Sequence, residues 1–474
     1  MTKPRRAKRP RRGRPDERGR AGAAAAPTRA RRLALEVLER VERTRAFADL
    51  ALHAALGRSE LPAGDRAFAT ELVQGSLRWR GRLDFLLAHV LDRDLAKLEP
   101  AVRCALRLGA YQIVFTDRVP HSAAVDETVR CVRAAGLERA TGLVNAVLRR
   151  LAAEWRGIAL PDLESDPLGH LSHVLSLPSW LAERWLARFG ASQAAALAGA
   201  LNAVPPRTVR ANLRRTTRQA LLAELRARFP AAQACRFAPA GIRLGPRGDP
   251  GRDPAFLEGR FTVQDEASQL VVDLLDPQPG ERVLDACAAP GGKATAIAER
   301  VGEEGRVLAL DRHARRLALV ARDARRLGLA NLAIRACDVA RAPGPLDAEP
   351  FDRVLVDAPC SGLGTLRRNP DLRWRVAPGD PARLAAAQLP ILRNAAAALR
   401  PGGALVYSTC TFEPEENEAV VQAFLDQAPG FRRTPRGALA EVVQPLLDEA
   451  GALRCWPHHH DTDGFFAVRL ERAS

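Results

Sequence analysis

Two cysteines follow predicted strands in the C-terminal half of the chain. Cys360 comes shortly after Asp357, which ends the apolar run Val354–Val356, and Cys410 follows the run Ala404–Ser408. Because the carboxyl ends of parallel strands meet at one edge of a sheet, both thiols are expected at that edge. A thiolate is a strong nucleophile, and an ordinary thiol ionises near about pH 8.5. Strand position therefore places two candidate nucleophiles in one site but does not show which of the two thiols attacks the substrate.

A loop of small residues follows a further predicted strand, Arg282–Asp285. The loop Cys287–Lys293 has the sequence Cys-Ala-Ala-Pro-Gly-Gly-Lys and leads into a predicted helix over 293–300. A glycine-rich turn between a strand and a helix lets a ligand approach the backbone closely. The loop matches neither the GxGxxG dinucleotide fingerprint nor the GxxxxGKS/T P-loop. It therefore predicts a ligand site without specifying the ligand.

Acidic residues stand at the ends of two more predicted strands. Asp311 ends the strand Gly305–Asp311, and Asp338 follows the strand Ala333–Ala336. An acid in the first of these positions can accept hydrogen bonds from both hydroxyls of a ribose, and Asp338 can accept from the amino group of an adenine. Together with Asp357, these acids predict a nucleoside cofactor beside the two thiols.

The chain is strongly basic. It has 474 residues and a net charge of +17, of which residues 1–31 contribute +10. This proline- and arginine-rich tail is expected to be disordered. A basic body with a more basic arm indicates a nucleic-acid partner, although solubility and an arginine-rich composition would explain the same charge.

Other sequence features bear on the compartment. No apolar run of about 18 residues and no secretory signal appears, so neither a transmembrane helix nor membrane binding is expected. None of the eight cysteines belongs to a CxxC pair, so no metal site is expected. Scattered thiols in a large chain fit a reducing cytoplasm.

Residues 32–157 are predicted to form an all-α domain. Helices are expected at Ala46–Leu56, Asp65–His89, Pro100–Phe115, Ala123–Ala135 and Glu138–Trp155. Several short motifs here resemble the NusB-type domain, which implies RNA binding; they are Asp65-Arg66, Leu72-Val73-Gln74-Gly75, Leu106–Tyr111, Val119-Pro120 with Val125-Asp126-Glu127, and Leu143–Leu148. Most of these residues are expected to serve helix packing and capping.

Residues 158–264 are predicted to contain linker helices and a small α+β module. The helices are expected at Leu181–Phe189 and Ser192–Leu201. In the first strand of the module, alternation predicts a polar face formed by Thr208, Arg210 and Asn212. The module resembles the RNA-recognition-like insert of RNA methyltransferases, although no strand carries the aromatic residues that stack on bases.

Strands and helices alternate from residue 265 to residue 474. This rhythm predicts a doubly wound, Rossmann-like domain with a mostly parallel sheet, and seven strands are expected. The last strand, Gly464–Leu470, is expected to be an antiparallel edge strand.

Four motifs in this domain resemble the Sun (Fmu) type of RNA cytosine-5 methyltransferase. They are DACAAPGGK at 285–293, LDR at 310–312, DAPCSGLGTLRRNPDLRW at 357–374 and YSTCTFEPEEN at 407–417. The resemblance extends from Val263 to the C-terminus. With the NusB-like domain in front, it implies an enzyme that transfers a methyl group from S-adenosylmethionine to carbon 5 of a cytosine in small-subunit (16S) ribosomal RNA.

The resemblance also implies roles for individual residues. Cys410 is the expected nucleophile, Cys360 the assisting thiol, and Asp357 a further catalytic residue. The expected cofactor-binding residues are Cys287, Ala288, Ala289, Pro290, Gly291, Gly292, Lys293, Asp311, Asp338 and Asp357. The chain departs from the family pattern at Asn369, where histidine is common, and Ser408 occupies a variable position. A monomer that does not act on DNA is expected.

Two other classes of protein fit part of the sequence. A non-catalytic RNA-binding protein on a cofactor-binding fold would not need two thiols at strand ends. A DNA cytosine-5 methyltransferase would use the Pro-Cys thiol, here Cys360, as its nucleophile and would not require the Thr-Cys thiol, here Cys410.

Three weaker signals are open to more than one interpretation. His458-His459-His460 fits metal binding, but a loop before the last strand is the simpler explanation. Arg367-Arg368 and Arg373-Trp374-Arg375 fit phosphate contact and base stacking, or equally a solvated loop.

Overall fold

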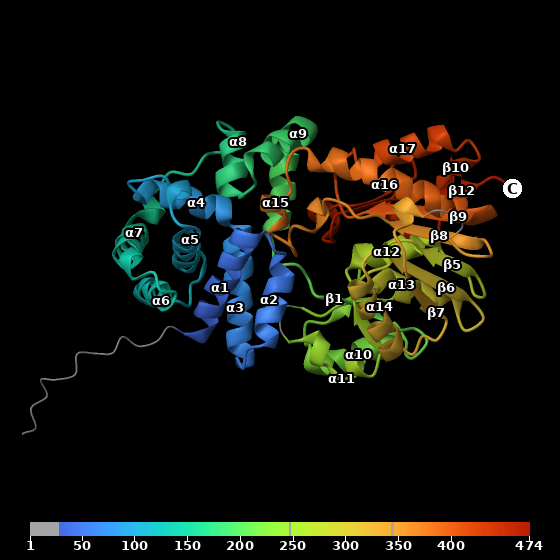
Figure 1. Ribbon diagram of the computed structural model, residues 1–474, viewed down its shortest axis with the longest axis horizontal. Coiled ribbons are helices and arrows are strands. Elements are labelled where there is room, and N and C mark those ends of the chain that lie inside the picture. Colours follow the sequence, from blue (N-terminus) through green and yellow to red (C-terminus); the bar gives the residue numbers. More distant parts are fainter. Residues whose placement is uncertain (1–27, 246–247, 343–345) are drawn as a thin grey trace, which may run out of the picture. The chain divides into compact units, whose positions relative to one another are not determined.

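The computed structural model describes residues 28–245, 248–342 and 346–474 (Figure 1). The predicted disordered tail lies, up to residue 27, outside the described residues. Helix α1 begins at Arg29, and Arg31 is buried, with its Nε donating to Gln112 Oε1 at 2.6 Å. The predicted boundary at residue 31 is therefore wrong, because it falls inside the first helix.

The fold divides into two compact units, which are described separately. The described residues up to Ser76 and the segment Leu86–Ile158 form the first unit, and Leu77–Phe85 joins Ala159–Ser474 in the second. The first unit is all-α, as the sequence predicts, and contains α1 (Arg29–Thr44), α2 (Ala48–Gly57), α5 (Pro100–Phe115), α6 (His121–Ala134) and α7 (Thr141–Glu154). Helices α3 (Ala63–Arg78) and α4 (Arg80–Val90) belong to it only in part, because Leu77–Phe85 is assigned to the second unit. Most residues of α5 are buried on all its sides, which makes α5 the core helix of this unit.

The single helix predicted over Asp65–His89 is broken into α3 and α4. In an unbroken helix the Gly81 N–H would bond to the Leu77 carbonyl. Here the Gly81 N–H donates to Ser176 Oγ at 2.8 Å, and the Leu77 carbonyl accepts from Trp374 Nε1 at 2.7 Å. Tertiary hydrogen bonds replace the helical one, and hydrophobic periodicity does not reveal them.

The second unit begins with helices and a small four-stranded sheet. Helix α9 (Ser179–Asn202) is bent at Gly190, where φ is 73°, between the two helices that the sequence predicts. The small sheet has the order β2-β3-β1-β4, with bounds β1 Thr208–Ala211, β2 Gln233–Ala234, β3 Gly241–Arg243 and β4 Phe261–Val263. Helices α10 (Arg218–Arg228) and α11 (Pro254–Leu257) complete this module.

Both faces of β1 are buried, so its predicted polar face does not meet solvent or RNA. Val209 packs in the core of the module, whereas Arg210 faces the larger domain. The Arg210 guanidinium donates to the Gly292 carbonyl at 2.7 Å and to Glu299 Oε1 at 2.8 Å. Asn212 Nδ2 donates to the Leu327 carbonyl at 3.1 Å. The alternation of polar and apolar residues correctly separates the two faces of β1, but the larger domain covers the polar face.

The larger domain is a doubly wound α/β sheet. Its strands are β5 (Arg282–Asp285), β6 (Arg306–Asp311), β7 (Leu332–Ala336), β8 (Phe351–Asp357), β9 (Leu399–Thr409), β10 (Phe431–Arg433), β11 (Leu453–Cys455) and β12 (Phe465–Arg472). The order is β10-β12-β9-β8-β5-β6-β7, with β11 paired to β12. Strands β5 to β9 are parallel, and β10, β11 and β12 pair in antiparallel fashion.

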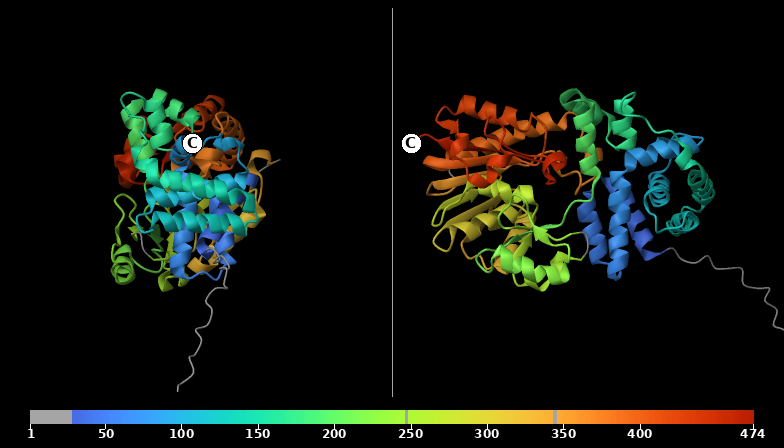
Figure 2. Two further views of the ribbon diagram at one scale, coloured as in Figure 1. Left: turned by 90° about the vertical axis from the view of Figure 1, so that its left-hand side faces the viewer. Right: turned by 180° about the vertical axis from the view of Figure 1, so that it is seen from behind.

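Helices cover both faces of this sheet (Figures 1 and 2). One apolar cluster joins the sheet to α12 (Glu266–Leu275) and α13 (Gly292–Val301), and a second joins it to α16 (Asp380–Ala397) and α17 (Glu418–Gln427). Helix α14 (Ala314–Leu327) packs beside α13.

The continuous order of this sheet has the seven strands that the sequence predicts, and β11 is an additional strand beside β12. The last strand is antiparallel, as predicted, but it is not at the edge, because β10 pairs with β12 on its outer side. Strands β10 and β11 are each three residues long and too short to show alternation. Within the described ranges, no helix is both long enough and apolar enough to cross a membrane.

A matched pair of glycine substitutions tests the packing of the first unit. A Cβ on Gly75, in α3, would lie 2.1 Å from Cζ of the buried Tyr111, whereas a Cβ on the exposed Gly142, in α7, meets nothing within 4 Å. Gly75→Ala should therefore destabilise the protein by roughly 1–3 kcal/mol through overpacking. Gly142→Ala should stabilise it by up to about 1 kcal/mol through helix propensity. Urea unfolding measures both; equal effects of the two substitutions would contradict this packing.

Candidate active site

Two neighbouring parallel strands bring the two predicted thiols together. In the β8–β9 register Asp357 lies opposite Ser408, so the loops that carry Cys360 and Cys410 leave the sheet side by side. The two Sγ atoms are 3.3 Å apart, and the Cys410 N–H donates to Cys360 Sγ at 3.3 Å. Both cysteines are partly exposed. The geometry gives a pair of thiols in direct contact at the carboxyl edge of the sheet.

Asp357 connects the thiol pair to the glycine-rich loop. One carboxylate oxygen accepts from Ser408 Oγ at 2.8 Å, and the other accepts from Lys293 Nζ at 2.7 Å. Lys293 is in the first turn of α13, with its side chain 9% exposed and its ammonium 4.9 Å from the ring centre of Phe465. An ion pair this well covered is screened little by solvent, so it fixes the loop relative to the Pro-Cys segment.

Asp285, at the end of β5, is a site residue that was left out of the predicted set. It is 1% exposed; Oδ1 accepts from the Cys287 N–H at 3.3 Å, and Oδ2 has no hydrogen-bond partner. Burial, together with the negative charge of Asp357, raises the pKa of Asp285 to about 7. The strand-end rule that identified Asp311 and Asp357 applies equally to Asp285.

Asp311 lies where a ribose-binding acid is expected. It is 7% exposed, and its two oxygens accept from the backbone N–H groups of Ala289 at 3.3 Å and His313 at 2.8 Å. Each carboxylate oxygen keeps a lone pair for a further donor. Asp338 is exposed and accepts from the Ala340 N–H at 3.2 Å. It follows Cys337, whose N–H donates to the Asp311 carbonyl at 3.0 Å.

The glycine-rich loop and these acids fit a nucleoside cofactor. Gly291 has φ = +116°, and a Cβ there would lie 3.1 Å from the Cα of Val320, so the turn requires glycine at this position. The unpartnered Asp285 oxygen and the free lone pairs of Asp311 are acceptors for hydroxyl or amino donors. S-adenosylmethionine carries such donors on its ribose, adenine and amino-acid parts.

For Arg367 and Arg373 both interpretations are wrong, because these side chains are 1% and 0% exposed and contact neither solvent nor RNA. The other residues of the two segments, Arg368, Trp374 and Arg375, are half-buried. Arg367 Nε donates to Asp463 Oδ1 at 2.7 Å, and Arg373 Nη1 donates to the Ser176 carbonyl at 3.0 Å. Burial lowers the pKa of Arg373 to about 9. Composition cannot distinguish such structural arginines from nucleic-acid ligands.

The histidine run does not form a metal site in the described part of the chain. His458, His459 and His460 belong to the short helix α18 (Pro457–His460), rather than to the loop that was expected, and no group of metal-ligating side chains gathers there or elsewhere among the described residues. His460 Nδ1 accepts from the Trp456 N–H at 3.0 Å, so this ring caps a backbone group.

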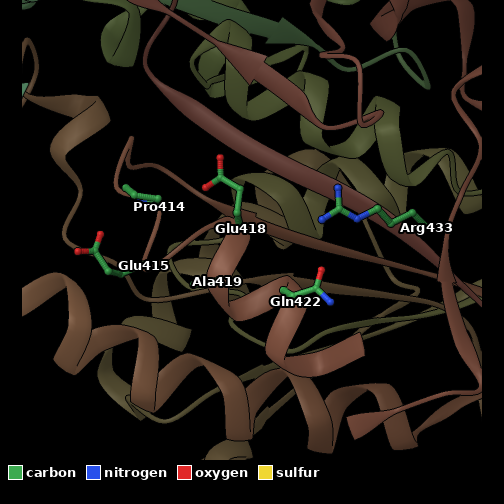
Figure 3. Close-up of a pocket in the computed structure, with 6 residues that line it drawn as sticks. All are labelled: Pro414, Glu415, Glu418, Ala419, Gln422 and Arg433. Carbon is green, nitrogen blue, oxygen red and sulfur yellow. The ribbon is translucent and has the colours of Figure 1, made fainter. Parts of the chain in front are cut away.

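Two surface hollows lie away from the thiol pair. One is lined by Pro414, Glu415, Glu418, Ala419, Gln422 and Arg433, beside α17 (Figure 3). The other is lined mainly by residues from the amino ends of β5, β6 and β7, at the opposite edge of the sheet. No predicted site residue lines either of them.

A doubly wound sheet with a glycine-rich loop and acids at its carboxyl edge fits an enzyme that uses a nucleoside cofactor, and the match to a methyltransferase family model identifies the class as methyltransferases that use S-adenosylmethionine. Family models match three successive parts of the chain: the NusB family at 28–153, the ferredoxin-like domain of RsmF/B-like methyltransferases at 177–249, and 16S rRNA methyltransferase RsmB/F at 272–471. The chain belongs to the RsmB/F family of 16S rRNA methyltransferases.

Individual relatives match most of the chain. A probable ribosomal RNA small subunit methyltransferase B from Synechocystis is 40% identical over 446 residues, which cover 94% of this chain and 99% of that protein. The ribosomal RNA small subunit methyltransferase B of Pseudomonas putida is 38% identical, over 86% of this chain and 90% of its own. A solved methyltransferase homologue from Pyrococcus horikoshii has a TM-score of 0.55 at 30% identity, over 65% of this chain and 98% of that one.

The raised pKa of Asp285 predicts a pH-dependent stability of the cofactor-free protein. An unfolded aspartate titrates near about pH 3.9, so between about pH 4 and pH 7 the unfolded chain loses a proton that the folded protein keeps. The free energy of unfolding should therefore fall as the pH rises through this range. Asp285→Asn should reduce the fall by up to a few kcal/mol.

Urea unfolding of the wild type and of Asp285→Asn at pH 5 and pH 8 measures this effect. Asp338→Asn, a substitution of an exposed acid after β7, is the control. If Asp285→Asn changes the stability by the same amount at both pH values, Asp285 does not carry the titration.

Proposed function

We propose that the protein methylates carbon 5 of a cytosine in small-subunit (16S) ribosomal RNA through a covalent bond to Cys410. The observation that carries this proposal is the contact of two thiols, 3.3 Å apart, beside Asp357 and the cofactor loop. The RsmB/F match and the methyltransferase B relatives support ribosomal RNA as the substrate. The NusB-type domain supports RNA binding.

The chemistry explains the need for a thiol nucleophile. Carbon 5 of cytosine is too weak a nucleophile to accept a methyl cation equivalent directly. The Cys410 thiolate forms a bond to carbon 6, and the ring becomes an enamine with electron density on carbon 5. S-adenosylmethionine supplies the methyl group. A base then removes the proton from carbon 5, the sulfur–carbon 6 bond breaks, and Cys410 leaves as a thiolate.

The other site residues support these steps. Cys360, in contact with Cys410, assists the elimination. Asp357 retains acceptor capacity beyond Ser408 and Lys293, and we propose that it holds the exocyclic amine or the ring nitrogen of the base. The target base must leave any stack, because carbon 6 is not accessible within a helix.

The cofactor-binding roles are also part of the proposal. The backbone of Cys287–Lys293 approaches the cofactor, Asp311 accepts from its ribose hydroxyls, and Asp338 accepts from its adenine amino group. We further propose that the protein acts as a monomer in the cytoplasm.

One alternative remains within the same chemistry. In the arrangement of DNA cytosine-5 methyltransferases, Cys360 would attack carbon 6. The two sulfur atoms are in contact, so their positions do not show which thiol attacks carbon 6. The choice of Cys410 depends on the Thr-Cys motif of the Sun-type enzymes.

Asp311→Ala tests the cofactor site. The substitution removes a largely buried charged acceptor and should weaken S-adenosylmethionine binding by roughly 1–3 kcal/mol. Titration calorimetry on the RNA-free protein measures the affinity. Asp276→Ala, in the αL residue after α12, is the control, since this acid lies at the other edge of the sheet. An unchanged affinity in Asp311→Ala would refute the assignment.

Substitution of the two thiols separates their roles. Cys410→Ala should lose both methylation and the covalent protein–RNA adduct, because no sulfur attacks carbon 6. Cys360→Ala should still attack and transfer the methyl group but should release product slowly, so that an adduct accumulates on a denaturing gel. Cys337→Ala, a partly exposed cysteine outside the pair, is the control. The reverse pattern would assign the attack to Cys360.

A further inference from the structure

A buried glutamate connects the two thiol loops and has no role in the steps above. Glu416, in the segment between Cys410 and α17, is 0% exposed. Oε1 accepts from the Ser361 N–H at 2.8 Å and from Gln388 Nε2 at 3.0 Å, and Oε2 accepts from Ser361 Oγ at 2.5 Å. Among the described residues no lysine or arginine pairs with it. Burial raises the pKa of the Glu416 carboxyl, and the three donors that converge on it act in the opposite direction, because they stabilise its ionised form.

These hydrogen bonds hold Cys360 from both sides. Ser361 follows Cys360, and Pro359 precedes it; the Pro359 carbonyl accepts from Gln388 Nε2 at 3.0 Å, so Gln388 contacts both Pro359 and Glu416. The Tyr407 hydroxyl, in β9, lies 2.6 Å from the Glu416 carbonyl and 3.0 Å from Gln388 Oε1, so its single proton is shared between these two acceptors. The Cys360 loop is thereby tied to α16 and to β9.

The same network reaches the Cys410 loop. Ser361 Oγ lies 2.8 Å from Thr411 Oγ1, and Thr411 follows Cys410. When Glu416 is ionised, the single proton of the Ser361 hydroxyl is donated to it, and the Thr411 hydroxyl is then the donor in its contact with Ser361. Glu416 therefore sets the direction of a chain of hydrogen bonds that joins the residues directly after the two cysteines.

We propose that Glu416 is a positioning residue of the methylation reaction: its carboxylate holds the Cys360 loop against the Cys410 loop so that the two thiols stay in contact through the elimination step. The proposal rests on the proposed function in assigning the elimination to Cys360. It adds a residue that touches neither the cytosine nor the cofactor and acts through Ser361.

The charge of Glu416 supports a second effect on Cys360. The contact with Cys410 and burial raise the pKa of the Cys360 thiol well above its ordinary value, and the negative charge of an ionised Glu416 acts in the same direction. A buried carboxylate without a cation thus favours the neutral thiol of Cys360. Glu416→Gln removes this charge, so the Cys360 pKa should fall.

The test compares Glu416→Gln with Glu415→Gln in the full-length protein. Glu415 is the adjacent glutamate, lines the outer hollow of Figure 3 and pairs with Arg184, and its side chain is 35% exposed. With a 16S rRNA transcript and S-adenosylmethionine, Glu416→Gln should lower kcat by up to roughly 100-fold, the effect of about 1 Å of misplacement. KM for the cofactor should change little, and covalent adduct should accumulate as in Cys360→Ala. Glu415→Gln should behave as the wild type.

A second measurement needs no RNA. In a Cys410→Ser background, alkylation of Cys360 by iodoacetamide is followed against pH by peptide mass spectrometry. Glu416→Gln should shift the midpoint to lower pH, whereas Glu415→Gln should leave it in place. A purely structural role of Glu416 would lower the melting temperature without moving this midpoint. Equal adduct fractions and equal midpoints in the two folded variants would overturn the proposal.

Two further arms keep the result interpretable. If Glu416→Gln does not fold, Ser361→Ala takes its place, because this variant keeps the backbone donor and removes only the hydroxyl. Ser361→Ala should accumulate adduct to a smaller extent than Glu416→Gln, and no accumulation would overturn the proposal.

A failure of the covalent mechanism itself would appear differently, as an absence of adduct in the wild type and in Cys360→Ala alike. The alkylation midpoint of Cys360 would then decide the role of Glu416.

Discussion

The parallel pairing of β8 with β9 is the constraint on which the site depends. The register that sets Asp357 opposite Ser408 starts the two cysteine loops at the same height on one edge of the sheet. A parallel ladder requires a long crossover between its strands, and here α15 (Leu372–Arg375) and α16 supply it. The Lys293–Asp357 ion pair then joins β5 and its glycine-rich loop to this edge. Two thiols, an acid and a cofactor loop are thus positioned by backbone pairing and one covered charge pair.

The sequence was sufficient to predict the features that follow from strand ends. Polar residues directly after apolar runs identified Asp311 and Asp357, and the structure places both at the carboxyl edge of the sheet. The same rule applies to Asp285, which ends β5. The rule works because a parallel sheet presents the carboxyl ends of its strands together, whatever the tertiary context.

What sequence patterns did not predict depends on contacts between distant segments. The break after α3 depends on Ser176 and Trp374, about 100 and 300 residues away in the chain. The burial of Arg367 depends on its ion pair with Asp463. The positioning role proposed for Glu416 depends on its hydrogen bonds with Ser361 and Gln388, which come from other segments of the chain. Local periodicity carries no information on such partners. Charged residues in a basic, arginine-rich chain are therefore the residues whose roles are hardest to read from the sequence.

The contact of Arg210 with Gly292 and Glu299 affects how this fold can be divided. Glu299 is nearly as buried as Arg210, and it is paired with a side chain from the small module rather than from its own α/β domain. A chain cut between the module and the α/β domain would lose this well-covered ion pair and the hydrogen bond from Arg210 to the Gly292 carbonyl. The module and the α/β domain thus share buried polar contacts, and we expect recombination in evolution to exchange them together rather than one at a time.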